Sequence, residues 1–128
     1  MIEVNIDGAS AGNPGPSGAG IFIKNNGVVE KHSIPLGVMD NHEAEFHACR
    51  IALEMCLEKQ ADTVWLRSDS QAVVQGIEKE FVRNSQYKPL LQEILNLTRQ
   101  MNLFFVKWVP SKENKAADEL ARKAIHLN

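Results

Sequence analysis

Four acidic residues lie far apart in the sequence, yet each stands where a predicted strand ends or a predicted helix begins: Asp7, Glu45, Asp69 and Asp118. Asp7 ends an alternating strand over residues 1–7, and Asp69 ends another strand over residues 62–69. If these two strands are parallel neighbours, both carboxylates project from one sheet edge, where open α/β sheets place ligands. Glu45 and Asp118 lie in the first turns of two predicted helices, so the sequence predicts an acidic cluster.

Carboxylates that meet at one edge repel one another and raise one another's pKa values. Hard divalent cations relieve this repulsion, and Mg²⁺ in particular prefers oxygen ligands, keeps several waters and completes its shell with substrate phosphate. A pair of such ions about 4 Å apart cleaves phosphodiesters. Individually, Asp69 and Asp118 would suit helix N-termini, Asp7 a turn, and Glu45 contact with a surface lysine. These separate roles do not explain why all four could meet.

Glu45 raises a second question, because it stands at the head of an apolar helical stripe. The residues at offsets of three, four, seven and eleven from it are Ala48, Cys49, Ala52 and Cys56. An ionised carboxylate is costly to bury without a partner, so either Glu45 lies just beyond the edge of the core or a positive group lies beside it. The two cysteines on this helix would be about 10 Å apart, too far for a disulfide, which predicts buried reduced thiols.

The elements expected around the acids alternate between strands and helices. We predict strands at 1–7, in a hairpin over 21–34 that turns at Asn26-Gly27, at 62–69 and at 103–110, with helices at 41–60, 70–80, 90–101 and 113–125. Residues 8–20 and 35–41 are expected to be loops. The hairpin implies antiparallel pairing and the later crossovers imply parallel pairing. The sequence therefore predicts an α/β fold with a mixed five-stranded sheet.

Composition limits the function only loosely. The chain has 128 residues, 44% apolar and 23% charged, with a formal net charge of −2. This is the size of one domain, over residues 1–128, and it lacks the strong positive field of many nucleic-acid binders. No secretory, transmembrane or lipidation signal is visible. We therefore expect a cytoplasmic protein with no membrane contact, and the sequence indicates no obligate protein partner.

The four acids lie in four sequence motifs: "DGASAGNPGPSGAG", "NHEAEF", "SDSQAVVQGI" and "ENKAADELARKA". With these motifs in this order, the sequence resembles the ribonuclease HI family nearly from end to end. The resemblance implies an RNase H-like fold, with helices on both faces and strands four and five parallel to strand one. It also implies a metal-dependent endonuclease that cuts the RNA strand of RNA–DNA hybrids. The resemblance assigns metal binding and catalysis to Asp7, Glu45, Asp69 and Asp118.

The same resemblance implies the cofactors and the substrate contacts. Two Mg²⁺ ions per site, with Mn²⁺ as a substitute, would activate a water and stabilise the leaving 3′ oxygen, giving 5′-phosphate ends. Recognition of RNA requires contacts to the 2′-hydroxyl. By resemblance, the substrate-binding residues are Gly8, Asn13, Asn41, Gln71 and Gln75.

Three departures from the family pattern keep a second hypothesis open. Asp40 stands where many members carry a phosphate-binding threonine, and a carboxylate there would repel phosphate. The loop that carries a product-release histidine in many bacterial members offers only Lys112 or Lys115. Some members have a basic protrusion between the fourth and fifth strands, whereas residues 78–100 here carry four basic and three acidic side chains. This near balance predicts weak hybrid binding with steep salt sensitivity. The alternative is therefore a weakly active or non-catalytic nucleic-acid-binding member of the same fold.

Overall fold

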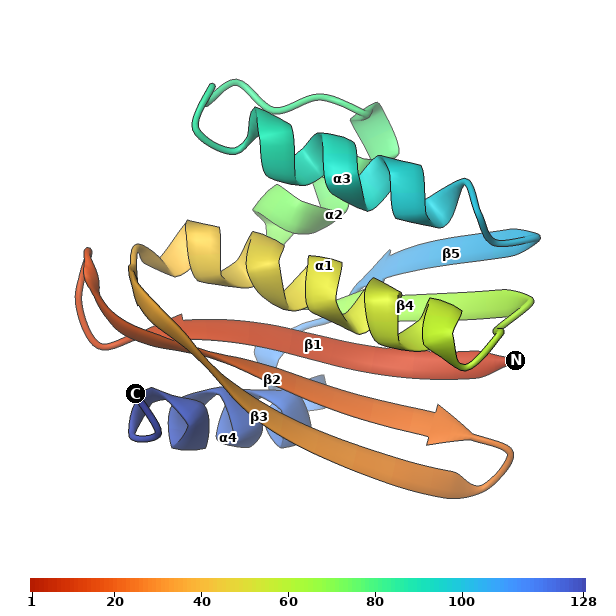
Figure 1. Ribbon diagram of the computed structural model, residues 1–128, viewed down its shortest axis with the longest axis horizontal. Helices are drawn as coiled ribbons and strands as arrows, with labels where there is room; N and C mark the ends of the chain where they lie inside the picture. The colour runs from red at the N-terminus through yellow and green to blue at the C-terminus, as the bar shows by residue number, and fades with distance from the viewer.

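The centre of the sheet is the first strand, β1 (Ile2–Ser10), in the computed structural model, which describes residues 1–128 (Figure 1). The other elements, in chain order, are β2 (Gly15–Asn25), β3 (Val28–Met39), α1 (Asn41–Glu58), β4 (Thr63–Ser68), α2 (Gln71–Lys79), α3 (Lys88–Thr98), β5 (Leu103–Trp108), the 3₁₀ turn η1 (Ser111–Glu113) and α4 (Lys115–Ile125). The strand order is β3-β2-β1-β4-β5.

The predicted mixed sheet is confirmed. β1 pairs antiparallel with β2, and β2 pairs antiparallel with β3, whereas β4 lies parallel to both β1 and β5. Figure 1 shows α1, α2 and α3 on one face of the sheet and α4 on the other. Parallel neighbours need long crossovers, and the helices between β3 and β5 provide them.

The hairpin between β2 and β3 turns at Asn26-Gly27, as predicted. Both residues have positive φ, 51° and 81°, which is the backbone of the two-residue turn that suits the twist of a hairpin. Asparagine and glycine tolerate this conformation better than other residues. The sequence therefore sets the register of this antiparallel pair locally.

Two predicted loops are wrong. Residues 8–20 are mostly strand, because β1 continues to Ser10 and β2 begins at Gly15. Residues 35–39 extend β3, with a bulge opposite Ser17 and Gly18. Glycine and proline usually mark turns, but here Gly8, Gly18 and Gly20 lie under closely packed helices, and Pro35 is tolerated because β3 is an edge strand.

The apolar stripe of α1 lies in the core, as its spacing predicts. Ala48, Cys49, Ala52 and Cys56 are fully buried, and both cysteines are free thiols. The last predicted helix begins two residues late, because residues 111–113 form the separate turn η1. None of the helices has the length and apolar character needed to span a membrane.

Candidate active site at the edge of the sheet

Asp7 and Asp69 lie where two parallel strands stop pairing. The last residues that β1 and β4 pair with each other are Ile6 and Ser68, so each acid directly follows the end of this parallel ladder. Asp69 does not cap α2, because the hydroxyl of Ser70 accepts the hydrogen bond from the Val73 amide at 3.2 Å. The carboxylate of Asp69 is therefore left available at the sheet edge.

Glu45 reaches this edge because α1 packs directly against the backbone of β1. A Cβ atom at Gly8 would overlap the backbone of Ala44 and Glu45. Only glycine permits so close an approach of helix to strand, which places Glu45 beside the end of β1. This close packing explains why a carboxylate stands at the head of the apolar stripe.

Asp118 approaches from the opposite face of the sheet, in the first turn of α4. Gly20 of β2, the residue paired with Asp7, lies under this helix, and a Cβ atom there would overlap the backbone of Ala117 and Ala121. The Arg122 side chain, one turn later, lies 3.2 Å from the Asp118 carboxylate. Arg122 was not among the predicted site residues, although its position four residues after Asp118 is the spacing at which ion pairs form on a helix.

All four carboxylates line one open hollow of about 460 Å³. Asn41, Ser10 and Ser111 also line it, and Arg122 is its one cationic side chain. Burial raises the pKa of Asp7 to about 8, and the neighbouring Asp69, Asp118 and Glu45 add to the rise. Burial also raises the pKa of Glu45, with Asp69 contributing. In the absence of a cation, the hollow therefore disfavours the ionised form of these carboxyl groups.

The donor set of this hollow suits a hard divalent cation, because it consists of carboxylate and amide oxygens. No three His, Cys, Asp or Glu side chains in the structure lie close enough together to hold one metal ion. The acids line an open hollow instead of a closed cage. Mg²⁺ sites are often of this open kind, with one or two carboxylates and with water and substrate phosphate completing the shell.

Comparisons with known proteins identify the family. The family described as "Reverse transcriptase-like" matches residues 5–124. A ribonuclease H from Salmonella arizonae is 33% identical over 139 residues, which cover 97% of this chain and 88% of the relative. The chain belongs to the ribonuclease H family. A protein of Enterococcus faecalis named EbsB is more similar, at 42% identity over 127 residues, covering 98% of this chain and 94% of EbsB.

Solved ribonuclease H structures share the whole fold. The crystal structure of RNase H1 from the archaeon Halobacterium salinarum has a TM-score of 0.92 at 28% identity, over 99% of this chain and 98% of that one. LC11-RNase H1, whose crystal structure is a complex with an RNA/DNA hybrid, has a TM-score of 0.89 at 28% identity, over 99% and 98% of the two chains. The RNase H-like fold predicted from the sequence is confirmed.

The structure divides the substrate-binding residues predicted for this ribonuclease H family member into two groups. Asn41 lines the acidic hollow and donates from its side chain to Glu45 at 3.1 Å, while its backbone amide donates to Asn13 at 2.9 Å. Gly8 also lines the hollow. Gln71 and Gln75 are exposed on α2 and lie outside the hollow, as do the exposed Lys112 and Lys115.

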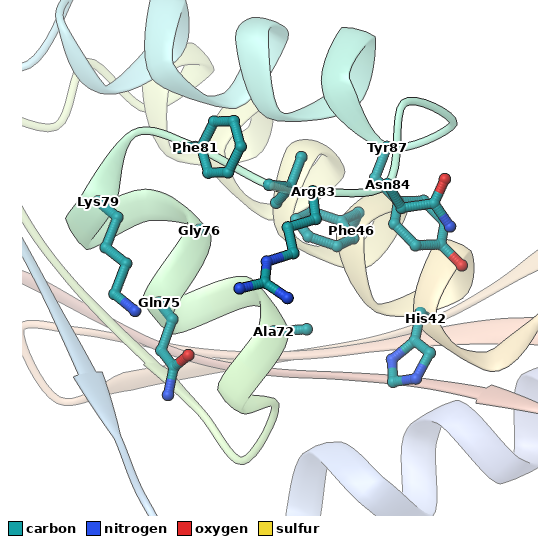
Figure 2. A pocket seen from close by; sticks show the side chains of 11 residues that line it. His42, Phe46, Ala72, Gln75, Gly76, Lys79, Phe81, Arg83, Asn84 and Tyr87 are labelled. Atoms are coloured by element: carbon teal, nitrogen blue, oxygen red, sulfur yellow. The ribbon is translucent and has the colours of Figure 1, made fainter.

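A second hollow, of about 590 Å³, lies between α1, α2 and the segment 81–87 (Figure 2). Lys79, Gln75, Arg83 and His42 line it, against the rings of Phe46 and Tyr87, and no acidic residue does; the complete lining is His42, Phe46, Ala72, Gln75, Gly76, Lys79, Phe81, Val82, Arg83, Asn84 and Tyr87. In Figure 2 the polar ends of Gln75, Lys79 and Arg83 project into the same open space. This hollow is therefore positively charged.

The charge count over residues 78–100 did not predict this basic surface. Glu80 pairs with Arg99 at 3.2 Å, and Glu93 lies 3.7 Å from Arg50, so two of the three acids of this segment are engaged outside the hollow. The third, Glu78, does not line it. Lys79 and Arg83 make no ion pair. Sequence counting gives the balance of a segment but not which of its charges share a face.

Asp40, which departs from the family pattern, has a structural role. Its carboxylate caps α1 by accepting from the Glu43 amide at 2.8 Å, and it accepts from the Tyr87 hydroxyl at 3.0 Å. Burial raises the pKa of Tyr87 to about 12, and the hydrogen bond to Asp40 adds to the rise. These bonds tie segment 81–87 to the start of α1.

Proposed function

We propose that this protein is a divalent-metal-dependent endonuclease that hydrolyses the RNA strand of RNA–DNA hybrids. The observation that carries the proposal is the hollow that four carboxylates line at the sheet edge, with Asp7 among three other acids and with Arg122 as its single cation. A charge arrangement of this kind is unfavourable in isolation and is relieved by hard cations. Membership of the ribonuclease H family supports the reaction class.

Asp7, Glu45, Asp69 and Asp118 would share two metal ions between them, with water and substrate phosphate as the remaining ligands. When bound, two Mg²⁺ or Mn²⁺ ions supply a water activated for attack on the scissile phosphate and stabilise the leaving 3′ oxygen, so that 5′-phosphate ends result. A cation bound beside Asp7 would favour its ionised form and so lower this raised pKa.

The two hollows offer separate surfaces to the two strands of a duplex. They meet at the first turn of α1, where Asn41 lines the acidic hollow and its neighbour His42 lines the basic one. We propose that the RNA strand lies over the carboxylates, with Asn13 and Asn41 near its 2′-hydroxyl groups, and that Lys79 and Arg83 contact phosphates of the DNA strand. Gln75, beside Lys79, would contact the duplex between them.

A non-catalytic nucleic-acid-binding role is the second candidate. It is favoured by Asp40, whose charge lies near the start of α1, and by Lys112 and Lys115, which lie outside the acidic hollow. In this role the basic hollow would bind a duplex without cleavage. The two candidates differ in cleavage and not in binding, so one experiment separates them.

The test incubates a fluorescently labelled RNA–DNA hybrid with the purified protein in Mg²⁺ or Mn²⁺, beside an Asp7→Asn variant prepared identically. Binding is measured in parallel by fluorescence anisotropy in EDTA. We expect the wild type to cut only the RNA strand and the variant to bind the hybrid without cutting it. Equal cleavage by both proteins would indicate a contaminating nuclease. Binding without cleavage by either protein would favour the non-catalytic candidate.

A further inference from the structure

We propose that a buried pair of amide side chains, Asn5 and Asn114, positions Asp118 relative to Asp7 and thereby sets the metal affinity of the acidic hollow. The proposal deepens the metal-dependent function proposed above and rests on it. Asn114 is 1% exposed and Asn5 is 8% exposed, although they lie 109 residues apart in the sequence. Burying two amides is unfavourable unless their hydrogen bonds are satisfied.

The side chain of Asn114 is bonded on both ends to the strand that carries Asp7. Its Oδ1 accepts from Asn5 Nδ2 at 3.0 Å, and its Nδ2 donates to the carbonyl of Ile6 at 2.8 Å. That carbonyl belongs to the peptide unit that joins Ile6 to Asp7. Asn5 and Asp7 also lie on the same face of β1, because side chains alternate along a strand.

The main chain of Asn114 holds the other acid. Its carbonyl accepts from the backbone amide of Asp118 at 3.1 Å, which makes it the first hydrogen bond of α4. One residue therefore contacts the peptide unit next to Asp7 through its side chain and the amide of Asp118 through its backbone. The separation of the two acids depends on a short chain of hydrogen bonds through Asn114.

The direction of the Asn114 side chain distinguishes this role from ordinary helix capping. Asn114 stands at the N-cap of α4, where asparagine usually accepts from an amide in the first turn of its own helix. Here its side chain makes no such bond. Both polar atoms of its side chain bond to β1 instead, so the asparagine at this position stabilises the contact with the sheet and not the end of the helix.

Docking of α4 onto the sheet does not depend on this pair. The hydroxyl of Ser33 donates to the carbonyl of Leu120 at 2.8 Å, and the side chain of Asn128 donates to the carbonyl of Ser17 at 2.8 Å. The inner residues Ala117, Ala121 and Ala124 are fully buried. A loss of the Asn5–Asn114 contact would leave α4 attached but its first turn free to shift.

The test compares Asn114→Ala and Asn5→Ala with Ser33→Ala, which removes a hydrogen bond between α4 and β3 whose two residues do not line the acidic hollow. Mn²⁺ binding is measured by calorimetry without substrate, and the thermal midpoint of each protein is measured in EDTA. We expect Asn114→Ala to bind Mn²⁺ about 10-fold or more weakly, since residues that orient metal ligands have effects of this size. Asn5→Ala, which removes one bond of two, should show a smaller loss.

If Asn114 had a purely structural role, Asn114→Ala would lower the thermal midpoint without weakening Mn²⁺ binding, which is the pattern expected of the control. Ser33→Ala should lower the thermal midpoint and leave Mn²⁺ affinity within about twofold of the wild type. For Asn114→Ala, kcat at subsaturating metal should fall while KM for the hybrid is unchanged. If Asn114→Ala does not fold, Asn5→Ala decides the question. Wild-type affinity in the folded asparagine variants would overturn the inference alone, whereas a wild type that binds no metal would overturn the proposed function and the inference together.

Discussion

Replacing Asp7 by asparagine should stabilise the metal-free protein, and the gain should depend on pH. The folded protein holds the proton of Asp7 up to about pH 8, whereas the ordinary value of this pKa is 3.8. Between these values the folded state binds more protons than the unfolded state, so stability falls as the pH rises. Asp7→Asn removes this dependence because its amide does not titrate.

The size of the effect follows from the shift. At pH 7 the wild type is about 3 pH units above the unfolded-state pKa, and each unit is worth about 1.4 kcal/mol, which gives about 4 kcal/mol. This is an upper bound, because salt screens part of the repulsion from the neighbouring acids. For a chain of this length it corresponds to a rise in Tm on the order of 10 °C.

The assay is urea unfolding of both proteins in EDTA from pH 4 to pH 8. Glu119→Gln, which removes an exposed carboxylate from the outer surface of α4, is the matched control. The advantage of Asp7→Asn should be small at pH 4, grow toward pH 8 and be absent from the control. Added Mg²⁺ should stabilise the wild type more than the variant. The reasoning is refuted if Asp7→Asn is no more stable than the wild type at pH 8.

Three further predictions concern binding, packing and the ion pair of the acidic hollow. The double variant Lys79→Gln, Arg83→Gln should bind the hybrid more weakly in anisotropy titrations and reduce the slope of log affinity against log salt by about 2, one unit for each lost phosphate contact. Gly8→Ala should destabilise the protein by about 1–3 kcal/mol in urea unfolding and abolish cleavage, because the new methyl group would push α1 and Glu45 away from β1. Arg122→Ala should tighten Mn²⁺ binding about two- to fivefold in calorimetry, because an exposed cation no longer competes for Asp118.

Each of these predictions has a control or an opposing result. The double variant Lys24→Gln, Lys31→Gln, which removes the same charge from the β2–β3 hairpin, is the control for the first prediction. If it reduced the slope of log affinity against log salt equally, only net charge would matter. A Gly8→Ala variant that cuts at the wild-type rate would contradict the close-packing argument. Weaker Mn²⁺ binding by Arg122→Ala would mean that this arginine holds Asp118 in place for the metal.

The fold was predictable where local chemistry and global topology agree. The Asn26-Gly27 turn, the alternation in β1 and the apolar stripe of α1 are each sufficient evidence for their element, and the structure confirms them. The strand order follows from the hairpin and the crossovers. Predictions failed at residues 8–20 and 35–41, where glycine and proline were interpreted as turn residues although the tertiary contacts of the sheet determine their conformation.

The basic hollow was not predictable for a related reason. It depends on Lys79 and Arg83 sharing a surface with His42 of α1, and on Glu80 and Glu93 finding partners elsewhere. The partners of these two ion pairs are separated by 19 and by 43 positions in the sequence, and a charge count within one segment does not show which residues pair. The structural role of Asp40 was hidden in the same way, because its partner Tyr87 belongs to a different segment.

The assembly of the acidic hollow depends as much on absent side chains as on present ones. Gly8 follows Asp7 along β1 and lies under α1, while Gly20 pairs with Asp7 across the ladder and lies under α4. Neighbouring positions along a strand face opposite sides of the sheet, so the two glycines open both faces beside one carboxylate. One helix brings Glu45 and the other brings Asp118. The acids can be found in the sequence by residue type. The role of the two glycines, which let the helices approach the sheet, is evident only from the packing of α1 and α4 in the structure.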